Sequence, residues 1–500
     1  MLATFLSRAG VGVHAPEVTV EVHTGGGLAK FLLVGLPEAV VRESRERVRS
    51  ALKNSGFSFP QGRLTVNLAP ADIPKEGGRF DLPIALGILS AVGAISVDSD
   101  DSTEYYGELG LGGDLRPFRG ALPAAVKCRD ANRTMVLPRA NADEAVLADG
   151  VRVLAADNLA QVCAHISGLE RLPVHNGCGY GSDNGRYPDL ADVRGQQHAR
   201  RALEIAATGG HSVLFIGPPG TGKSMLASRL PGILPAMNAT EALETAAVAS
   251  ISPEGFDPSR WLSRPFRSPH HSASGAALVG GGASPRPGEI SLAHNGVLFL
   301  DELPEFKRSV LEVLRQPLEE GTVMIARAAR KSAFPCRFQL VAAMNPCPCG
   351  YLGDPQGECN CSLDRVQAYR NRISGPLLDR IDLHVEVPRP GKELLRPDAS
   401  PGEASADVAA RVEAARRAQL ARGGCLNASL QGDAINAMCQ PDPEGMDLLE
   451  QAMETFGLSA RAYQRVLRVA RTIADMDSAG AVQARHVGEA IALRRLDRRV

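Results

Sequence analysis

Short apolar runs, each bounded by turn-forming residues, alternate along the chain with longer amphipathic stretches. Near the beginning, residues 18–22 and 64–68 alternate between apolar and polar positions as strands do, whereas residues 39–52 and 82–91 have helical spacing. Strands and helices that follow one another in this way predict an α/β domain, to which we assign residues 1–172.

A segment without periodicity separates this domain from the rest of the chain. Residues 173–187 are rich in Gly, Asn, Asp and Ser and predict a linker. Residues 188–388 again mix apolar runs with helical stretches and predict a second α/β unit. A proline-rich break follows, and residues 389–500 have mostly helical patterns. The predicted organisation is therefore an N-terminal domain, a core and a C-terminal helical lid.

Composition and charge add few constraints. The chain has 500 residues, enough for about three domains, and 44% of them are apolar. Its formal net charge is −1, so binding to a polyanion must depend on local clusters of basic residues. The N-terminus lacks a basic start with a long apolar core, and no apolar run is long enough to span a bilayer. We expect a cytoplasmic protein without a membrane partner.

A glycine-rich segment carries the first chemical signal. It follows the apolar run 211–216 and precedes a stretch with helical spacing, so the order is strand, loop and helix. Glycines let backbone N–H groups approach phosphates, a lysine reaches the terminal phosphates, and a hydroxyl binds Mg²⁺. The segment therefore predicts an ATP site. Its residues are Gly217, Pro218, Pro219, Gly220, Thr221, Gly222, Lys223 and Ser224.

An acidic pair farther along the chain adds the catalytic part of the predicted site. The apolar run 296–300 ends in Asp301 and Glu302, as expected for a buried parallel strand whose carboxyl end opens at the nucleotide. Asp301 would bind Mg²⁺ together with Ser224, and Glu302 would polarise the attacking water. The two motifs together predict an ATPase with ATP and Mg²⁺ as cofactors.

Two further polar residues stand beside strand candidates. Asn345 follows an apolar run, where its amide can orient water against the γ-phosphate or simply end the strand as a turn residue. Arg380 stands on a tight loop before another apolar run. Its planar, permanently charged side chain suits a clamp on the transition state, but an ion pair with Asp379 or Asp382 is an equally good interpretation.

Four of the ten cysteines lie in one short stretch rich in Gly and Pro, whereas the other six are scattered. Four thiolates suit tetrahedral Zn²⁺, although the C-x-C spacing found here is less usual than C-x₂-C. Structural zinc and ordinary reduced cysteines are both open interpretations. The four residues are Cys347, Cys349, Cys359 and Cys361.

Two stretches inserted among these motifs have an unusual composition. Residues 272–289 are too glycine-rich for a core element and predict an exposed, mobile loop. The runs 322–327 and 333–344 resemble strands and flank basic residues, which predicts a hairpin with a basic tip or a solvated turn. The basic residues are Arg327, Arg330 and Lys331.

The order of motifs resembles AAA+ ATPases of the magnesium-chelatase-like branch, the ComM or YifB family, over nearly the whole chain. Besides the glycine-rich segment, the matching segments are residues 35–38, 67–70, 266–271, 300–303, 345–350 and 374–382. The resemblance implies a P-loop core, with a parallel sheet between helices, and a C-terminal helical lid. By the same resemblance, the roles are Walker A for Lys223 and Ser224, Walker B for Asp301 and Glu302, sensor 1 for Asn345, arginine finger for Arg380 and sensor 2 for Arg461.

The family also implies an assembly and a substrate. AAA+ ATPases work as rings in which the finger enters the neighbouring site, so we expect a homo-hexamer. Comparable inserts in the magnesium-chelatase and MCM-helicase branch point into the pore, which implies that Arg327, Arg330 and Lys331 bind DNA. The expected function is a motor on single-stranded or branched DNA, a helicase or branch-migration enzyme in recombination or natural transformation, with recombination proteins as further partners. The alternative is a chelatase-type or protein-remodelling ATPase that acts on a protein partner.

Residues 1–172 resemble the proteolytic domain of Lon proteases, an α/β fold like domain 2 of ribosomal protein S5. The resemblance rests on residues 74–77 and 107–117. At the positions that correspond to the serine nucleophile and the lysine base of Lon, this chain has Arg79 and Leu122. We therefore expect the fold without proteolysis.

Overall fold

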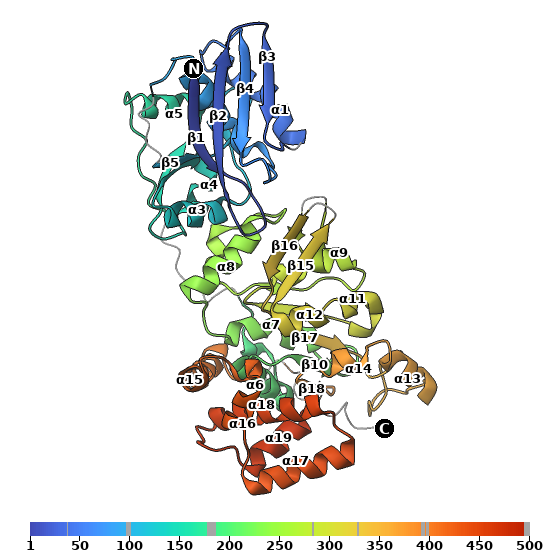
Figure 1. Ribbon diagram of the computed structural model, residues 1–500. Coiled ribbons are helices and arrows are strands. Elements are labelled where there is room, and N and C mark those ends of the chain that lie inside the picture. Colours follow the sequence, from blue (N-terminus) through green and yellow to red (C-terminus); the bar gives the residue numbers. More distant parts are fainter. Residues whose placement is uncertain are drawn as a thin grey trace.

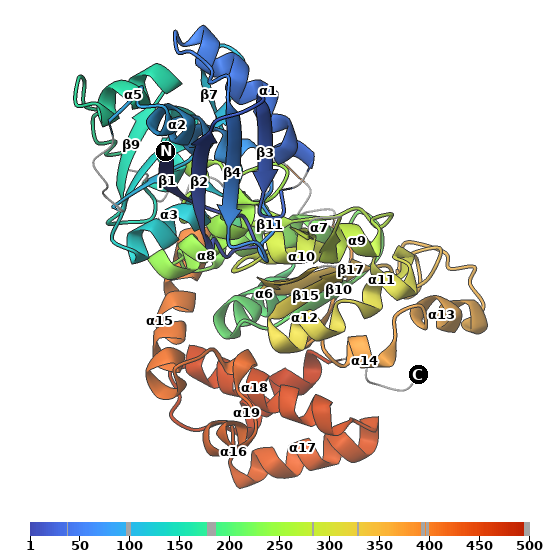
Figure 2. The ribbon, with the colours of Figure 1, turned by 45° about the horizontal axis from the view of Figure 1, so that its top comes forward.

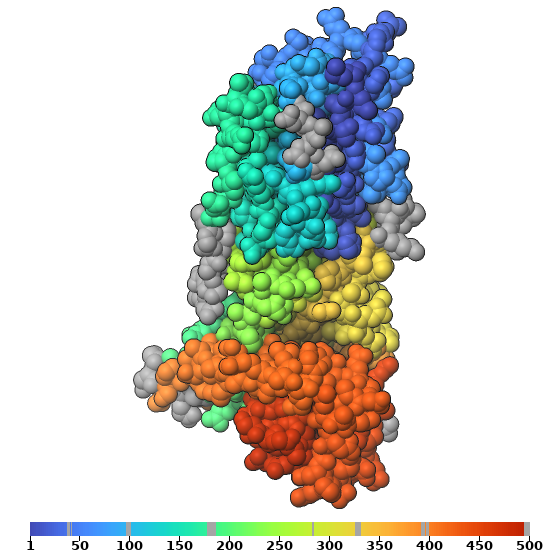
Figure 3. Space-filling model, turned by 60° about the vertical axis from the view of Figure 1, so that its left-hand side comes forward, coloured from blue at the N-terminus to red at the C-terminus, as the bar shows by residue number. Residues whose placement is uncertain are grey.

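The computed structural model describes residues 1–37, 39–96, 102–177, 187–282, 285–327, 330–391, 396 and 400–494. Figure 1 shows an N-terminal sheet with its helices at one end, a second sheet in the middle and a helical part at the other end. The space-filling view in Figure 3 shows these parts one below another, from blue through green and yellow to red. Within the described residues, no helix is long and apolar enough to cross a membrane. The arrangement confirms the predicted α/β fold with a helical C-terminal part.

The N-terminal part is built on a mixed sheet of seven strands in the order β3-β4-β2-β1-β5-β8-β9. Strand β2 (Glu17–Gly25) runs antiparallel to both of its neighbours, and the other pairs are parallel. Figure 2 shows the first four strands of the chain side by side. Val18, Val20 and Val22 of β2 are buried, as the alternating sequence predicts.

The remaining elements of this part are β1 (Leu2–Arg8), β3 (Lys30–Val34), α1 (Ala39–Asn54), β4 (Arg63–Ala69), α2 (Asp81–Ala91), β5 (Thr103–Tyr105), β6 (Glu108–Leu109), β7 (Leu115–Arg116), α3 (Ala121–Asp130), β8 (Thr134–Pro138), α4 (Arg139–Ala145), β9 (Arg152–Ala156) and α5 (Leu159–Ile166).

The core contains a parallel sheet of five strands in the order β11-β14-β17-β10-β18. Strand β10 (Val213–Ile216) lies between β17 (Gln339–Met344) and β18 (Leu383–Glu386), both of which come later in the chain. Such a switch in strand order opens a crevice at the carboxyl edge of a parallel sheet. The side chains of β10 and β17 are all buried, and apart from Gln339 at the start of β17 they are apolar.

The other core elements are α6 (Gln197–Gly209), α7 (Lys223–Ile233), α8 (Ala239–Ser250), β11 (Phe266–Arg267), α9 (Gly275–Val279), β12 (Gly280–Gly281), β13 (Arg286–Pro287), α10 (Glu289–Leu292), β14 (Val297–Leu300), α11 (Arg308–Glu312), α12 (Arg315–Glu320), β15 (Thr322–Arg327), β16 (Arg330–Pro335), α13 (Leu363–Arg370) and α14 (Gly375–Leu378).

Both inserts differ from their predicted form. The stretch 272–289 was expected to be a mobile loop, but it contains α9 and the antiparallel pair β12–β13. Helix α9 forms because Ser274 accepts a hydrogen bond from the N–H of Ala277 at its start and because Leu278 is fully buried. One cap and one apolar anchor thus order a segment whose composition indicates a loop.

The basic hairpin has a different register from the predicted one. Strand β16 begins at Arg330, which pairs with Arg327 of β15, so Arg330 and Lys331 lie in a strand and not in the turn. Strand β16 ends at Pro335, and β17 is a separate strand of the core sheet.

The helical part contains α15 (Ser405–Gly423), α16 (Asp433–Met438), α17 (Pro443–Phe456), α18 (Ala460–Met476) and α19 (Ala484–Ala492). Side chains of α15 and α18 share one apolar cluster with α6, α7 and the core strands, so the helical part is packed on the sheet. On the opposite side, Ala246 of α8 belongs to an apolar cluster of the N-terminal part. The N–H of Gly120 also donates to the carbonyl of Ser250, 3.1 Å away, and joins the two parts.

Candidate active site

The glycine-rich segment forms a loop between β10 and α7, at the carboxyl edge of the core sheet. Gly220 and Gly222 have φ values of 78° and 88°, a region that favours glycine. A Cβ at Gly217 would lie 2.2 Å from the carbonyl oxygen of Val387, so no larger residue fits there. The loop and the start of α7 together supply the backbone N–H groups and the positive helix end that bind phosphates.

Lys223 lies inside this loop with only 9% of its surface exposed. Its ammonium donates to the carbonyl oxygens of Gly217 and Pro218, at 2.7 and 2.9 Å, and to Oδ1 of Asn345, at 3.2 Å. Burial lowers the pKa of Lys223, and the nearby Asp301 and Glu302 counteract this effect. Neutral oxygens hold the ammonium in place, and the phosphates of a nucleotide would compete with them for it.

The two predicted magnesium ligands are in direct contact. The hydroxyl of Ser224 donates to Oδ2 of Asp301 at 2.7 Å, and the N–H of Glu302 donates to Oδ1 of the same carboxylate at 2.9 Å. Asp301 follows β14, which pairs in parallel with β17. A hydroxyl and a carboxylate are ligands that Mg²⁺ prefers, so the donor set fits this ion.

Asn345 directly follows β17, and its side chain accepts a hydrogen bond from Lys223. Because β17 lies beside β10, its carboxyl end meets the phosphate loop, and the N–H of Gly217 donates to the carbonyl of Met344 at 3.2 Å. The amide oxygen of Asn345 therefore lies beside the ammonium of Lys223. Lys223, Ser224, Asp301 and Asn345 form one group at the carboxyl edge.

Arg380 lies at the opposite edge of the sheet. It precedes β18, whose first residue Leu383 pairs with Val213 at the start of β10, whereas the phosphate loop follows the end of β10. The hydroxyl of Ser212 donates to the carbonyl of Arg380 at 3.1 Å. A four-residue strand is about 13 Å long, farther than an arginine side chain reaches. Arg380 is therefore remote from the phosphate loop of its own chain.

The guanidinium of Arg380 is buried and already paired. It donates to the carbonyl of Pro376 at 2.6 Å and forms an ion pair with Glu319. The predicted alternative, an ion pair with Asp379 or Asp382, is wrong, because Asp382 pairs with Arg465 instead.

Arg461 lies on the same edge as Arg380. It is exposed in the first turn of α18, one turn before Arg465, whose partner Asp382 directly precedes β18. Burial alone would raise the pKa of Asp382, but Arg465 and His211 outweigh this effect and hold its pKa well below the usual range. This ion pair between the half-buried Arg465 and the buried Asp382 joins the first turns of α18 to the amino edge of the sheet.

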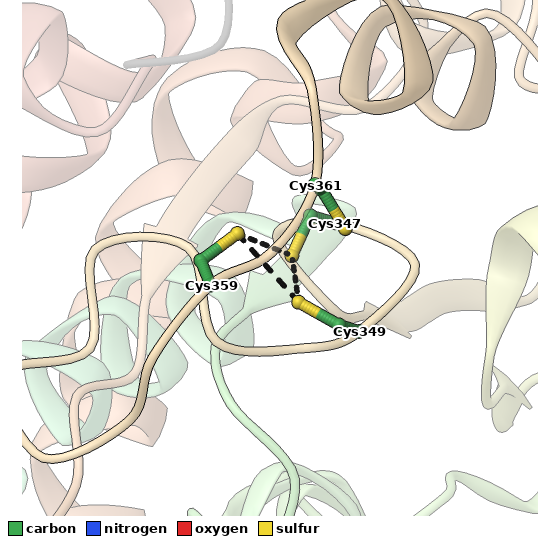
Figure 4. Close-up of side chains that lie close together, drawn as sticks. All are labelled: Cys347, Cys349, Cys359 and Cys361. Carbon is green, nitrogen blue, oxygen red and sulfur yellow. Dashed lines mark hydrogen bonds between the residues drawn. The ribbon is translucent and has the colours of Figure 1, made fainter.

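The four clustered cysteines converge in the loop between β17 and α13 (Figure 4). The sulfur of Cys347 lies 3.3 Å from that of Cys349 and 3.7 Å from that of Cys359, and the last two are 3.6 Å apart. The sulfur of Cys361 completes a group whose members all lie within 4.8 Å of one another. A tetrahedron with Zn–S bonds of about 2.3 Å has edges of about 3.8 Å, so the arrangement fits Zn²⁺.

Comparison with known proteins agrees with this architecture. The family described as magnesium chelatase, subunit ChlI, matches residues 189–395, and related descriptions of the ChlI subunit match residues 20–141 and, as its C-terminal part, 402–494. YifB of Escherichia coli is 49% identical over 98% of this chain and 97% of its own length. Competence protein ComM of Haemophilus influenzae is 48% identical over 99% of this chain and 98% of its own length.

The chain belongs to the YifB/ComM family of magnesium-chelatase-like proteins. It is thus an AAA+ ATPase, and the family implies ATP and Mg²⁺ as its nucleotide and ion. Lon protease 2 of Bacillus subtilis is 27% identical over 28% of this chain and 25% of its own length, a match that agrees with the Lon-like fold expected from the sequence.

In this member of the YifB/ComM family, the three predicted DNA-binding residues occupy one end of the β15–β16 hairpin. Arg327 pairs with Arg330, and Lys331 pairs with Ala326. Their side chains lie outside the described part of the structure, which gives only their backbone. The backbone register nevertheless places three basic residues within two neighbouring pairs of the ladder.

At the Lon-like positions, the N-terminal part holds side chains that cannot act as nucleophile or base. Arg79 is buried against the ring of Phe118, 5.1 Å from its centroid, and donates to the carbonyl of Arg119 at 2.6 Å. Burial lowers the pKa of Arg79. Leu122 is fully buried and aliphatic.

The structure also brings in His271, to which the sequence assigned no role. Its Nδ1 lies 3.1 Å from Oε2 of Glu302, and its ring packs against those of His270 and Phe306. Strand β11 pairs in parallel with β14, so the residues after β11 reach the same edge as Asp301. The segment 266–271 was recognised as a family marker, and two adjacent histidines after its strand were the available signal.

Proposed function

We propose that the chain is an ATP-hydrolysing motor that assembles into a homo-hexameric ring, with each ATP bound between two subunits. One observation carries the proposal: Lys223, Ser224, Asp301 and Asn345 lie at the carboxyl edge of the sheet, whereas Arg380 and Arg461 lie at the amino edge. A ring in which the amino edge of one subunit faces the carboxyl edge of the next would bring the two groups together. Arg380 would then clamp the transferred phosphoryl group in trans, with Arg461 as a further contact.

Within the carboxyl edge, each residue has a proposed task. Lys223 and the loop N–H groups bind the phosphates, and Ser224 and Asp301 would hold Mg²⁺, which shields phosphate charge when bound. Glu302 accepts a proton from the attacking water, and Asn345 orients that water through its amide. Glu302 is half exposed, with 54% of its side-chain surface accessible, so water reaches it.

DNA is the proposed substrate of the motor, in single-stranded or branched form. The two inserts pack as one unit, because a Cβ at Gly280 would lie 2.6 Å from Cδ1 of Ile325 in the hairpin. Six hairpins in a ring would line a channel with Arg327, Arg330 and Lys331, enough positive charge to follow a phosphate backbone despite the neutral chain. The relative from H. influenzae is named a competence protein, which supports helicase or branch-migration activity in recombination or transformation.

The parts of the chain have corresponding roles in this proposal. Residues 1–172 form a non-proteolytic domain, residues 173–187 a linker, residues 188–388 the ATPase core and residues 389–500 the lid. The four clustered cysteines bind Zn²⁺. The motor works in the cytoplasm together with recombination proteins.

ATPase assays with single-stranded, duplex and branched DNA test the proposal, combined with strand-displacement assays and light scattering in the presence of a non-hydrolysable ATP analogue. We expect hexamers, DNA-stimulated turnover and strand displacement. The alternative result is an ATPase rate that no DNA changes and that a protein fraction raises. That result would favour a remodelling ATPase with a protein substrate.

Charge removal tests the DNA contact separately. Replacing Arg327, Arg330 and Lys331 by alanine should abolish DNA stimulation and leave basal turnover unchanged. A control variant loses three exposed arginines elsewhere, Arg45, Arg152 and Arg417. Equal effects of the two variants would contradict the assignment of the hairpin.

A further inference from the structure

The cysteine cluster lies directly against the ATP site. A zinc ion that only stabilised the fold would not need to lie there. Cys347 is the second residue after Asn345 and is fully buried, while the other three cysteines are half-buried. The loop that carries them begins where β17 ends, at the strand whose carboxyl end meets the phosphate loop. Two peptide bonds therefore join the first cysteine of the cluster to Asn345.

A second contact joins the cluster to the phosphate loop itself. Gly350 follows Cys349 with φ at +87°, and a Cβ on it would lie 2.8 Å from Cδ of Pro219 and 3.9 Å from Cγ of Asn345. The backbone of the cysteine loop thus touches a phosphate-loop residue from one side, while Lys223 bonds Asn345 from the other. The close approach is possible because residue 350 is glycine.

Nothing regular in the backbone holds this loop in shape. All residues from Asn345 to Ser362 are described, and none of them belongs to a helix or a strand. Its outer half is fastened by Arg389, whose Nε lies 2.8 Å from Oδ2 of the buried Asp354 and whose guanidinium stacks over the ring of Tyr351. The inner half, next to Asn345, has the four cysteines as its cross-link. Long loops without regular structure keep one conformation only when such links hold them.

We infer that zinc bound to Cys347, Cys349, Cys359 and Cys361 is a clamp on the ATP site, which holds Asn345 and Pro219 in the geometry that binds nucleotide. ATP affinity then depends on zinc, although zinc touches neither the nucleotide nor Mg²⁺. This inference deepens the proposed ATPase and rests on it. Zinc is a positioning element here: it acts through Asn345 and the loop, and has no part in the chemical step.

The test uses the full-length protein and the double variant C359S/C361S, which removes the two ligands farthest along the chain from Asn345. The matched control is C425S, a half-buried cysteine at the end of α15. Three quantities are measured for each: zinc per chain by mass spectrometry of the metal, the Kd for a fluorescent ATP analogue, and hydrogen exchange of residues 345–361 and 217–224.

We expect about one zinc per chain in the wild type and in C425S. In the double variant, zinc content should fall, the Kd for the analogue should rise by about 10- to 100-fold, and both segments should exchange faster. Removing zinc from the wild type with a chelator, followed by restoration of Mg²⁺, should give the same change, and added zinc should reverse it. The chelation arm keeps the test valid if the double variant does not fold.

Three results would overturn the clamp: a wild type without zinc, iron with visible absorbance in place of zinc, or zinc loss that leaves both the Kd and the exchange unchanged. Failure of the proposed ATPase has a different signature. A zinc-loaded wild type that neither binds nor hydrolyses ATP would refute the ATP site, whatever the cysteine variants do.

Discussion

The two edges of the core sheet differ in how their charged groups are satisfied. At the carboxyl edge, Ser224 and Glu302 are exposed and Asp301 is half-buried, so a nucleotide and water reach them directly. At the amino edge, Arg380 and Asp382 are about as buried as apolar core residues, at 5% and 4% exposure, and both have ion-pair partners. Side chains at the carboxyl edge are thus accessible to a ligand, whereas Arg380 and Asp382 at the amino edge are held in ion pairs within the chain.

If the proposed ring forms, this contrast would leave one chain alone with an incomplete site. The carboxyl edge has one buried ammonium, that of Lys223, for a nucleotide that carries several negative charges. Arg380, which would share this charge, precedes β18 at the opposite end of the strands, and a four-residue strand is about 13 Å long. In the proposed ring, a neighbouring subunit would supply the arginine that the length of the strands keeps away from the phosphate loop of a single chain.

The largest effect is expected from Arg380→Ala. Loss of an arginine finger lowers kcat by about 10³- to 10⁵-fold, while ATP affinity should change little because Arg380 does not contact the phosphates of its own chain. Steady-state turnover and titration with a fluorescent analogue measure the two quantities. The control is Glu319→Gln, which removes the resting partner and keeps the finger. An assembled R380A ring with wild-type kcat would show that the amino edge is only structural.

Glu302→Gln tests the other edge. Removing a general base should lower kcat by about 10²- to 10⁴-fold while nucleotide binding and ring assembly persist, because the amide keeps the size of the side chain. Single-turnover hydrolysis and light scattering check both statements. If the variant fails to bind ATP, Glu302 has a role in the loop and not in water activation.

His271→Ala should have a smaller effect, since His271 acts through Glu302 as a positioning residue. We expect kcat to fall by less than about 10²-fold with KM unchanged, and His271→Gln, which retains a donor, to restore most of the rate. His270→Ala removes the neighbouring ring and serves as the control. A rise in KM equal to the fall in kcat would contradict this assignment.

Asp382→Asn should affect stability more than catalysis. Burial raises the pKa of Asp382, but Arg465 and His211 lower it further than burial raises it, so the folded state favours the ionised form. That stabilisation is present above the pKa of an unfolded aspartate, about 3.9, and is lost as the pH falls below it. At pH 7, the variant should lose about 3 kcal/mol because the half-buried Arg465 loses its charged partner.

Thermal unfolding over a range of pH measures this effect. The melting temperatures of wild type and D382N should differ most near neutral pH and approach each other below pH 4. A difference that persists unchanged in acid would mean that lost packing, and not the lost charge, causes the destabilisation.

The sequence predicted the carboxyl edge better than the amino edge for a physical reason. Lys223, Ser224, Asp301 and Asn345 each directly follow an apolar strand or a glycine loop, and parallel strands bring their carboxyl ends to one place without further information. Strand order, which separates Arg380 from the loop, depends on long-range pairing that no local pattern encodes. The partner of Arg380, Glu319 on α12, is likewise distant in sequence.

Local composition gave wrong predictions for the structure of both inserts, and the contact between His271 and Glu302 was not predicted. A glycine-rich stretch contains α9 because a single buried leucine, Leu278, outweighs its composition. The second strand of the hairpin ends at Pro335, whereas the apolar pattern predicted one strand that continues into β17. His271 follows β11 and Glu302 follows β14. Only the pairing of these two strands shows that the two side chains are in contact.

The most direct test of the shared site is a mixture of two inactive subunits. K223A lacks the phosphate-binding lysine and keeps Arg380, whereas R380A keeps the lysine and lacks the finger. Mixed in equal amounts and allowed to exchange, about a quarter of the interfaces would join an intact loop to an intact finger. The account predicts that ATPase activity reappears in the mixture. Activity no greater than the sum of the separate variants, in rings shown to contain both subunits, would contradict it.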